Sequence, residues 1–348
     1  MPAAKDTLDF IVIGAQKAAT TTLFHYLKHH PEIAVPIGKE APFFSHDQIY
    51  SRGWPAYMEN LANHGGLADP ALMWGTVTPQ YMVGGVLNAA SGGDYDERTV
   101  PVRMHEQLPD VRLVAILRDP VARARSHHRM LVRRGVERRP FDEAIAAMLT
   151  HDALEQARRR PQEATGYVVW GEYGRILAGY LECFERDQLL VVFTDELERS
   201  PAAVMSRIHA FIGVSADFQA PNLGERYLVA KPQRYFDWRN PRSWLSPSSP
   251  LSPQGMQRAV RRSRAARSIW HAVPLEGQHR LRRPYERLAR AADRRNRRSG
   301  EFNEVRADAA PSQATLARLR EHYTPDGARL AALLGHRPTW LADADAAP

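Results

Sequence analysis

Residues 9–27 of the chain have the sequence DFIVIGAQKAATTTLFHYL. Its first part is a continuous apolar run that ends at Gly14, which is typical of a strand buried in a parallel sheet. The second part places Leu23, Phe24 and Leu27 at helical spacing. The stretch therefore predicts a strand, a short loop and a helix.

A strand, loop and helix in this order make an anion-binding site, because backbone N–H groups and the positive end of the helix dipole meet at one point. We expect Lys17 and the hydroxyls of Thr20, Thr21 and Thr22 to lie around this point. The loop lacks the second glycine followed by Lys and Ser/Thr that nucleotide triphosphatases use. The spacing therefore argues against a kinase or an ATPase.

Similar elements follow along the chain, and their alternation predicts an α/β fold with a mostly parallel β-sheet flanked by helices. Apolar runs predict further strands at 33–35, 111–117 and 188–193. Helical patterns occupy 120–135, 140–158, 173–184, 202–212 and 316–340, and we expect Pro325 and Asp326 to form a turn and an N-cap inside the last of these.

Charge and cysteine content limit the classes of partner and compartment. The formal net charge of +8 favours an anionic ligand, a membrane surface or a nucleic acid. Only five of the 47 basic residues are lysines, so a lysine in a motif indicates a need for its compact point charge. With a single cysteine, Cys183, and an apolar strand too close to residue 1 for a signal peptide, we expect a cytoplasmic protein without a transmembrane segment.

Two motifs resemble those of the sulfotransferases that use 3′-phosphoadenosine 5′-phosphosulfate (PAPS). Residues 14–23, GAQKAATTTL, resemble the loop that binds the 5′-phosphosulfate of this family. Residues 118–128, RDPVARARSHH, directly follow a predicted strand and resemble the 3′-phosphate motif, which has an arginine at the strand end and a serine eight residues later. The resemblance implies the sulfotransferase fold, which is P-loop-like, with PAPS bound along the strand ends.

The same resemblance assigns roles to individual residues. Lys17 is expected to contact the oxygen that becomes the leaving phosphate, and no metal is expected. Lys231 and Arg234 occupy a position where the family often has a loop that closes over the adenosine and the 3′-phosphate. The predicted PAPS-binding residues are Gly14, Gln16, Lys17, Ala18, Ala19, Thr20, Thr21, Thr22, Arg118, Ser126, Lys231 and Arg234.

Three shorter segments resemble the glycan sulfotransferases and their bacterial relatives: KEAPFFS at 39–45, GTVTPQY at 75–81 and YTPD at 323–326. Glu40 in the first matches the glutamate that acts as the general base in that branch. Imidazole also titrates near neutrality, so His46, His127 and His128 are alternative bases.

The chain departs from the glycan branch at three positions in these segments. It has Pro42 and Ser45 where that branch has histidine and aspartate, and Val77 where a lysine is common. These positions help to hold sulfated sugars in that branch. We therefore expect an alcohol, phenol, lipid or carrier-tethered intermediate as acceptor rather than a heparan-like glycan.

Composition divides the chain into three expected regions: a PAPS-binding core at 1–235, a Pro/Ser-rich loop with an arginine-rich helical insertion at 236–310, and a C-terminal helical segment at 311–348 that packs on the core. The insertion contains fourteen arginines and no lysine between residues 258 and 298. Two other functions stay open: a basic protein that binds nucleic acid or an anionic membrane through this insertion, and a P-loop kinase. The sequence does not give the acceptor or the oligomeric state.

Overall fold

The computed structural model describes residues 5–64, 67, 69–87, 89, 96–134, 136–227 and 310–342. These residues fall into two units. The core unit comprises the described residues up to His127, those from Phe141 to 227 and those from Ser312 onward, and the second unit includes His128–Pro140. Lys231, Arg234 and the arginine-rich segment 258–298 lie outside the described residues.

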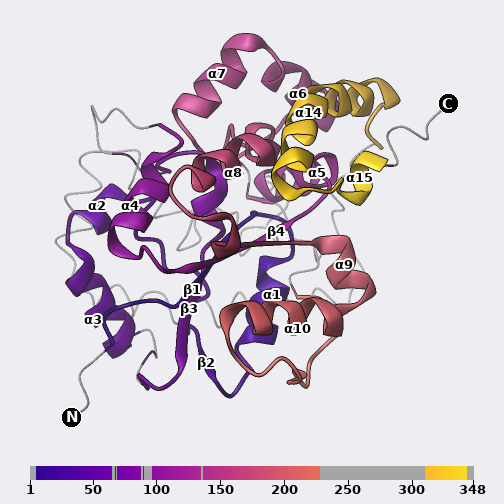
Figure 1. Cartoon of the computed structure of the whole chain (residues 1–348). Coiled ribbons are helices and arrows are strands. Elements are labelled where there is room, and N and C mark those ends of the chain that lie inside the picture. Colours follow the sequence, from indigo (N-terminus) through magenta and orange to yellow (C-terminus); the bar gives the residue numbers. More distant parts are fainter. Residues whose placement is uncertain are drawn as a thin grey trace, which may run out of the picture. The chain divides into compact units, whose positions relative to one another are not determined.

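A five-stranded sheet forms the centre of the core unit, in the order β2-β3-β1-β4-β5, with every neighbouring pair parallel (Figure 1). This confirms the predicted parallel α/β fold. The strands are β1 (Phe10–Gly14), β2 (Ile33–Ala34), β3 (Met73–Val77), β4 (Arg112–Leu117) and β5 (Leu189–Phe193).

Helices cover both faces of the sheet. Successive strand residues point to opposite sides, and because the strands are apolar on both sides, both faces must be buried. In β1, Ile11 and Ile13 belong to one hydrophobic cluster and Phe10 and Val12 to the other. The first cluster includes residues of α4, α8 and α14, and the second includes residues of α1 and α10 (Figure 1). The sheet is therefore buried on both faces, which explains why its strands are continuous apolar runs.

The described helices connect the strands and extend beyond them. They are α1 (Thr20–Leu27), α2 (Asp47–Tyr50), α3 (Trp54–His64), α4 (Thr99–Gln107), α5 (Pro120–Arg133), α6 (Phe141–Met148), α7 (His151–Arg159), α8 (Tyr173–Leu181), α9 (Thr194–Arg199), α10 (Pro201–Ile212), α14 (Gln313–Leu334) and α15 (Thr339–Ala342), with 3₁₀ turns η1 (Pro79–Val83), η2 (Val169–Gly171) and η3 (Arg186–Gln188).

The order of the strands fixes where a ligand can bind. After β1 the chain continues to β2 and β3 on one side, whereas after β4 it continues to β5 on the other. The carboxyl ends of β1 and β4 are therefore a topological switch point, where open α/β sheets bind their ligands. The loop after Gly14 and the residue Arg118 both lie at these ends.

Several details differ from the sequence prediction, and helices α2, α3, α4 and α9 were not predicted. Strand β3 was not predicted, although it pairs with both β1 and β2. The helix expected at 140–158 is two helices, α6 and α7, separated at Leu149 and Thr150. Helix α14 continues through Pro325, so the turn predicted at Pro325 and Asp326 is wrong.

Candidate functional site

The anion loop, defined here as residues 15–19 between β1 and α1, is fixed at its start by the sheet. The N–H of Ala15 donates to the carbonyl of Ile116 in β4 at 2.7 Å. A Cβ at Gly14 would lie 2.5 Å from the Cβ of Met82 in η1, so only glycine fits at the end of β1. The hydrogen bond ties the loop to β4, and the glycine allows η1 to pack against the end of β1.

Two residues of the anion loop have left-handed backbone conformations. Lys17 has φ 73° and Ala19 has φ 66°, which is uncommon for residues other than glycine. Left-handed residues occur in the backbone concavities that collect N–H groups around anions. Such conformations cost free energy and concentrate at functional sites, so they support an anion-binding role for the loop.

Arg118 meets the anion loop from the end of β4. Its Nη1 donates to the carbonyl of Lys17 at 3.4 Å. The hydroxyl of Tyr173 in α8 donates to the Arg118 carbonyl at 3.0 Å, and Tyr173 is fully buried. The structure therefore brings Lys17 and Arg118 together, and Ser126 lies farther along α5 with a partly exposed side chain.

Lys39 and Glu40 connect this region with the loop after β2. The Lys39 ammonium lies 3.1 Å from Oε1 of Glu40 and donates to Oγ1 of Thr20 at 3.4 Å. The side-chain amide of Gln80 donates to Oε2 of Glu40. Both oxygens of Glu40 are thus held while its side chain stays 42% exposed, which is the geometry a proton acceptor needs.

The other predicted residues of the anion loop and of the first turn of α1 contribute mainly to packing. Ala18, Thr20 and Thr22 are buried, and Oγ1 of Thr22 accepts from the N–H of Tyr227 at 3.2 Å. The Gln16 side chain donates to Glu163 at 3.1 Å. Thr21 and Gln16 are partly exposed, so of these five side chains they are the more accessible to a ligand.

The three histidines predicted as alternative bases lie in different surroundings. His127 is fully buried, and its Nδ1 accepts from the guanidinium of Arg123 at 3.3 Å. His128 belongs to the second unit, where its Nε2 lies 3.1 Å from the carbonyl of Arg139. Burial lowers the pKa of His46, with Asp47 opposing the effect, and its Nδ1 lies 3.0 Å from Ser45 Oγ.

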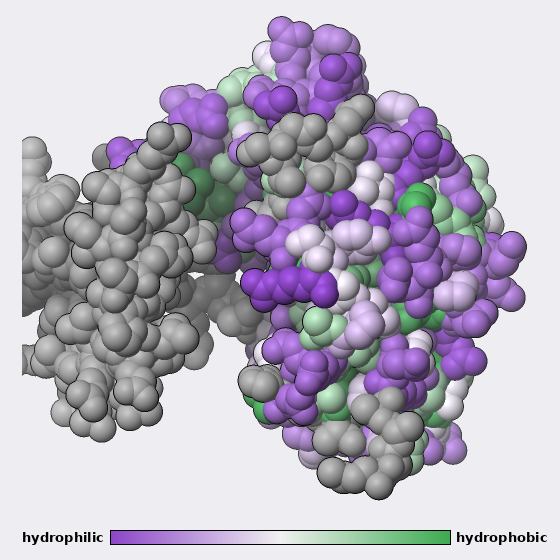
Figure 2. Space-filling model, turned by 90° about the vertical axis from the view of Figure 1, so that its left-hand side faces the viewer, coloured by the Kyte–Doolittle hydropathy of each residue, from purple (hydrophilic) through white to green (hydrophobic). Residues whose placement is uncertain are grey.

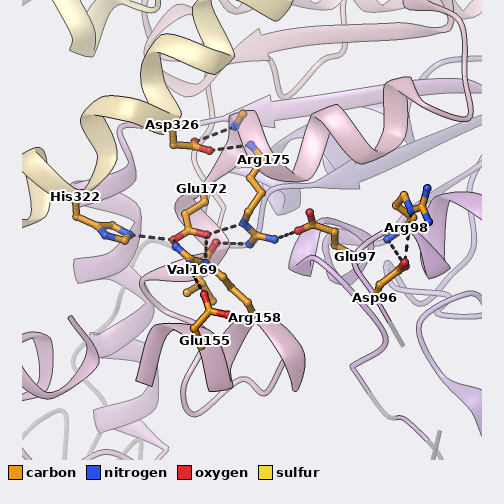
Figure 3. A network of polar contacts seen from close by, with 11 residues as sticks. Asp96, Glu97, Arg98, Glu155, Arg158, Val169, Glu172, Arg175, His322 and Asp326 are labelled. Carbon is orange, nitrogen blue, oxygen red and sulfur yellow. Dashed lines mark hydrogen bonds and ion pairs between the residues drawn. The ribbon is translucent and has the colours of Figure 1, made fainter. Parts of the chain in front are cut away.

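A second cluster of charges surrounds Glu172 and was missed by the sequence analysis (Figure 3). This buried carboxylate accepts two hydrogen bonds from Arg158, at 3.0 and 2.8 Å, and one from Arg175 at 2.7 Å. His322 of α14 lies 3.0 Å away. Only the tertiary fold brings α7, α8 and α14 together, so local sequence patterns carry no signal for this cluster.

Helix α14 also caps α8. The carboxylate of Asp326 accepts from the N–H groups of Gly174 and Arg175 at 2.9 and 2.7 Å, which satisfies two donors in the first turn of α8. Burial raises the pKa of Asp326, although these two hydrogen bonds oppose the effect. Asp326 is thus a cap, as its residue type indicates, but for another helix than its own.

The described residues form a mainly polar surface on one face (Figure 2) and hold no cluster of metal ligands. On the face shown in Figure 2, hydrophilic residues predominate and hydrophobic ones are scattered between them. None of the described helices is both long and apolar enough to cross a bilayer. Within the described residues, no group of three or more His, Cys, Asp or Glu side chains could hold a metal ion.

Fold and site together define an open parallel α/β protein with an anion loop at its topological switch point. Residues 7–228, which are more than half of the chain, match the family described as "Sulfotransferase domain". The chain therefore belongs to this family. The family membership agrees with the resemblance of the two phosphate motifs.

Individual relatives show how far the similarity extends. The chain is 26% identical over 208 residues to human heparan sulfate glucosamine 3-O-sulfotransferase 6, which covers 59% of this chain and 52% of that protein. It is 26% identical over 214 residues to human bifunctional heparan sulfate N-deacetylase/N-sulfotransferase 3, covering 59% and 22%. The match thus spans about half or less of the length of these relatives.

The match to one solved structure covers a larger share of that protein's chain than the matches to the relatives above. The crystal structure of a sulfotransferase from Alicyclobacillus acidocaldarius is 27% identical with a TM-score of 0.50, and the match covers 65% of this chain and 87% of that one.

Proposed function

We propose that this protein transfers a sulfuryl group from PAPS to a hydroxyl or amine of a small-molecule, lipid, glycan or carrier-tethered acceptor. The observation that carries the proposal is the contact between Arg118 and Lys17 at the carboxyl ends of β1 and β4. Nη1 of Arg118 lies 3.4 Å from the backbone carbonyl of Lys17. Two cationic side chains and the N-terminus of α1 suit a ligand with phosphates at both its 5′ and 3′ positions.

The residues of the site divide the work of the transfer. When bound, PAPS supplies the sulfuryl group and carries a nucleotide phosphate as leaving group. Lys17 and the N–H groups of the anion loop stabilise the negative charge that develops on the 5′-phosphate as its bond to sulfur breaks. Arg118 and Ser126 hold the 3′-phosphate, and Gln16 and Thr21 are the accessible polar side chains of the loop region.

Glu40 takes the proton of the acceptor hydroxyl as its oxygen forms the new bond to sulfur. The ammonium of Lys39 and the amide of Gln80 orient its carboxylate. Its 42% exposure leaves it accessible to an acceptor, whereas His127 and His128 are buried. The proposal therefore keeps Glu40 as the base and His46 as its alternative.

Two buried residues favour a small acceptor over a heparan-like glycan. Ser45 and Val77 stand where the glycan branch has groups that hold sulfated sugars, and both are fully buried here. A side chain packed into the interior offers no contact to a polysaccharide. We also retain a cytoplasmic location and the division into a core at 1–235, an insertion at 236–310 and a C-terminal segment at 311–348.

Calorimetric titration with the product nucleotide, 3′-phosphoadenosine 5′-phosphate (PAP), tests the cofactor. We expect PAP to bind more tightly than ADP or AMP, and Arg118→Ala to abolish that preference, because the guanidinium pairs with the 3′-phosphate. Arg112→Ala, which removes an arginine from the opposite end of β4, is the matched control. Equal affinities for PAP, ADP and AMP would contradict the proposal and favour a basic binding protein or a kinase.

Glu40→Gln tests the base. It preserves the size and most hydrogen bonds of the side chain, so PAP affinity should stay within a factor of about two, whereas general-base catalysis contributes about 100- to 10,000-fold to a rate. The measurement is PAP release from PAPS, with water or an acceptor found by screening. A variant that loses PAP affinity would remove Glu40 from this role.

A further inference from the structure

Lys39 lies in an unusual place for a cation. Its ammonium contacts the hydroxyl of Thr20, the first residue of α1, at 3.4 Å, and its side chain is only 16% exposed. The N-terminus of a helix carries partial positive charge, so an ammonium beside it is electrostatically unfavourable. Burial lowers the pKa of Lys39, although Glu40 opposes the effect.

The acidic partner of Lys39 is Glu40, and this pair does not explain the position of the ammonium. Glu40 is 42% exposed and also accepts from Gln80, so the pair is partly screened by water. Arginine serves almost everywhere else as the basic residue of this chain, which has only five lysines among 47 basic residues. A compact point charge beside the anion loop indicates a single anionic oxygen as its partner.

The contacts of Lys39 identify which anionic group that is. The ammonium contacts Thr20, the residue that directly follows the anion loop, and also Glu40, the proposed base. In an in-line transfer the acceptor oxygen lies beside the base, the leaving phosphate lies in the loop, and the sulfuryl group lies between them. A group that bridges the loop and the base therefore faces the sulfuryl group.

We propose that Lys39 is a catalytic residue whose ammonium binds an oxygen of the sulfuryl group. Lys39 acts on the side of this group that faces the acceptor, whereas Lys17 acts on the side of the leaving phosphate. This rests on the proposed function and extends it to the recognition of the donor over the product. The ammonium keeps its protons throughout, stabilises the charge on the sulfuryl oxygens while the acceptor–sulfur bond forms and the sulfur–phosphate bond breaks, and loses this contact once the sulfuryl group has left.

The test compares binding of PAPS with binding of PAP, which lacks the sulfuryl group, in the absence of acceptor. Lys39→Met should reduce the ratio of PAPS affinity to PAP affinity about tenfold, since one charge-assisted contact is lost only in PAPS. Lys39→Gln should do the same, because it also lacks the charge. The matched control is Lys28→Met, which removes an exposed lysine from the opposite end of α1 and should leave the ratio unchanged.

Three outcomes would overturn the assignment: an unchanged ratio in both Lys39 variants, an equal loss of affinity for PAPS and PAP, or the same change of ratio in Lys28→Met. An equal loss would mean that Lys39 contacts the 5′-phosphate or acts only through its net charge. Failure of the proposed function looks different, because the wild-type protein would then show no preference for PAP over ADP and AMP.

Discussion

The anion loop with its neighbours and the Glu172 cluster both concentrate charge in the core unit, but they balance it differently. Around Glu172, two arginines and a histidine surround one buried carboxylate, and Arg158 and Arg175 each have a second acidic partner. At the anion loop, cations lie beside a helix N-terminus and the carboxylate of Glu40 is exposed. Charges that pair inside the core hold helices together, whereas cations beside a helix N-terminus prepare a site for an anionic ligand.

Removing the central carboxylate of the Glu172 cluster should cause the largest loss of stability. Glu172→Ala leaves Arg158 and Arg175 partly buried around an empty position, and removal of one member of a buried ion pair costs about 3 kcal/mol or more. Urea unfolding would measure the loss. Glu155→Ala is the matched control, because this more exposed partner of Arg158 should contribute less than about 1 kcal/mol. Equal losses in the two variants would contradict the comparison.

Lys17→Ala should show the opposite behaviour at the anion loop. We expect the transfer rate to fall about 100- to 1,000-fold, because one donor to the developing negative charge is removed. The free energy of unfolding should change by less than about 1 kcal/mol, because interactions of this partly exposed side chain are screened by water. PAP release gives the rate and urea unfolding gives the stability. A large loss of stability would show that Lys17 is structural.

The smallest expected effect is the pH dependence of the Glu172 cluster. Burial alone would raise the pKa of Glu172, but hydrogen bonds from His322 and Arg158 outweigh it and hold the pKa below its ordinary value of 4.5. A carboxyl group whose pKa is lower in the folded state stabilises the protein above its unfolded pKa, and this contribution is lost as the pH falls through the folded pKa.

The difference in unfolding free energy between wild type and Glu172→Gln should therefore shrink as the pH falls below about 4.5. Glutamine keeps the shape of the side chain without its charge, so it isolates the ionisation. A difference that does not change with pH would mean that the carboxylate charge contributes nothing measurable.

Much of the fold could be predicted from local patterns because the sheet is buried on both faces. Strands β1, β4 and β5 consist of apolar runs, apart from Arg112 at the start of β4. Strand β3 was missed because its five residues include Gly75 and Thr76, which interrupt the apolar pattern. The structure explains the glycine, since a Cβ there would lie 2.3 Å from the ring of Phe10 in the neighbouring strand.

Pro325 shows why a local rule failed in α14. A proline inside a helix costs about 3 kcal/mol and usually marks a break. Here its ring is exposed, and the residues around it, Tyr323, Gly327 and Leu330, are buried. Packing of this face and the hydrogen bonds of Asp326 to α8 offset the cost, and neither contribution is visible in the sequence of the helix alone.

The candidate site could be predicted in part for the same reason. Lys17 and Arg118 each follow a strand, so parallel topology brings them to one edge of the sheet. The contact between Gln80 and Glu40 joins residues 40 positions apart, and the cluster at Glu172 joins three helices. Such pairings depend on tertiary distances that spacing along the chain does not encode.

The cap that Asp326 provides for α8 has a consequence for how this protein can be divided. The family match ends at residue 228, yet the first turn of α8 inside it depends on a carboxylate about 150 residues later in the chain. A fragment that stops at the end of the match would expose two helix donors and the apolar surface that α14 covers, next to the tyrosine that holds the Arg118 carbonyl. A fragment of this chain that is meant to fold on its own must therefore include α14 as well as the matched residues.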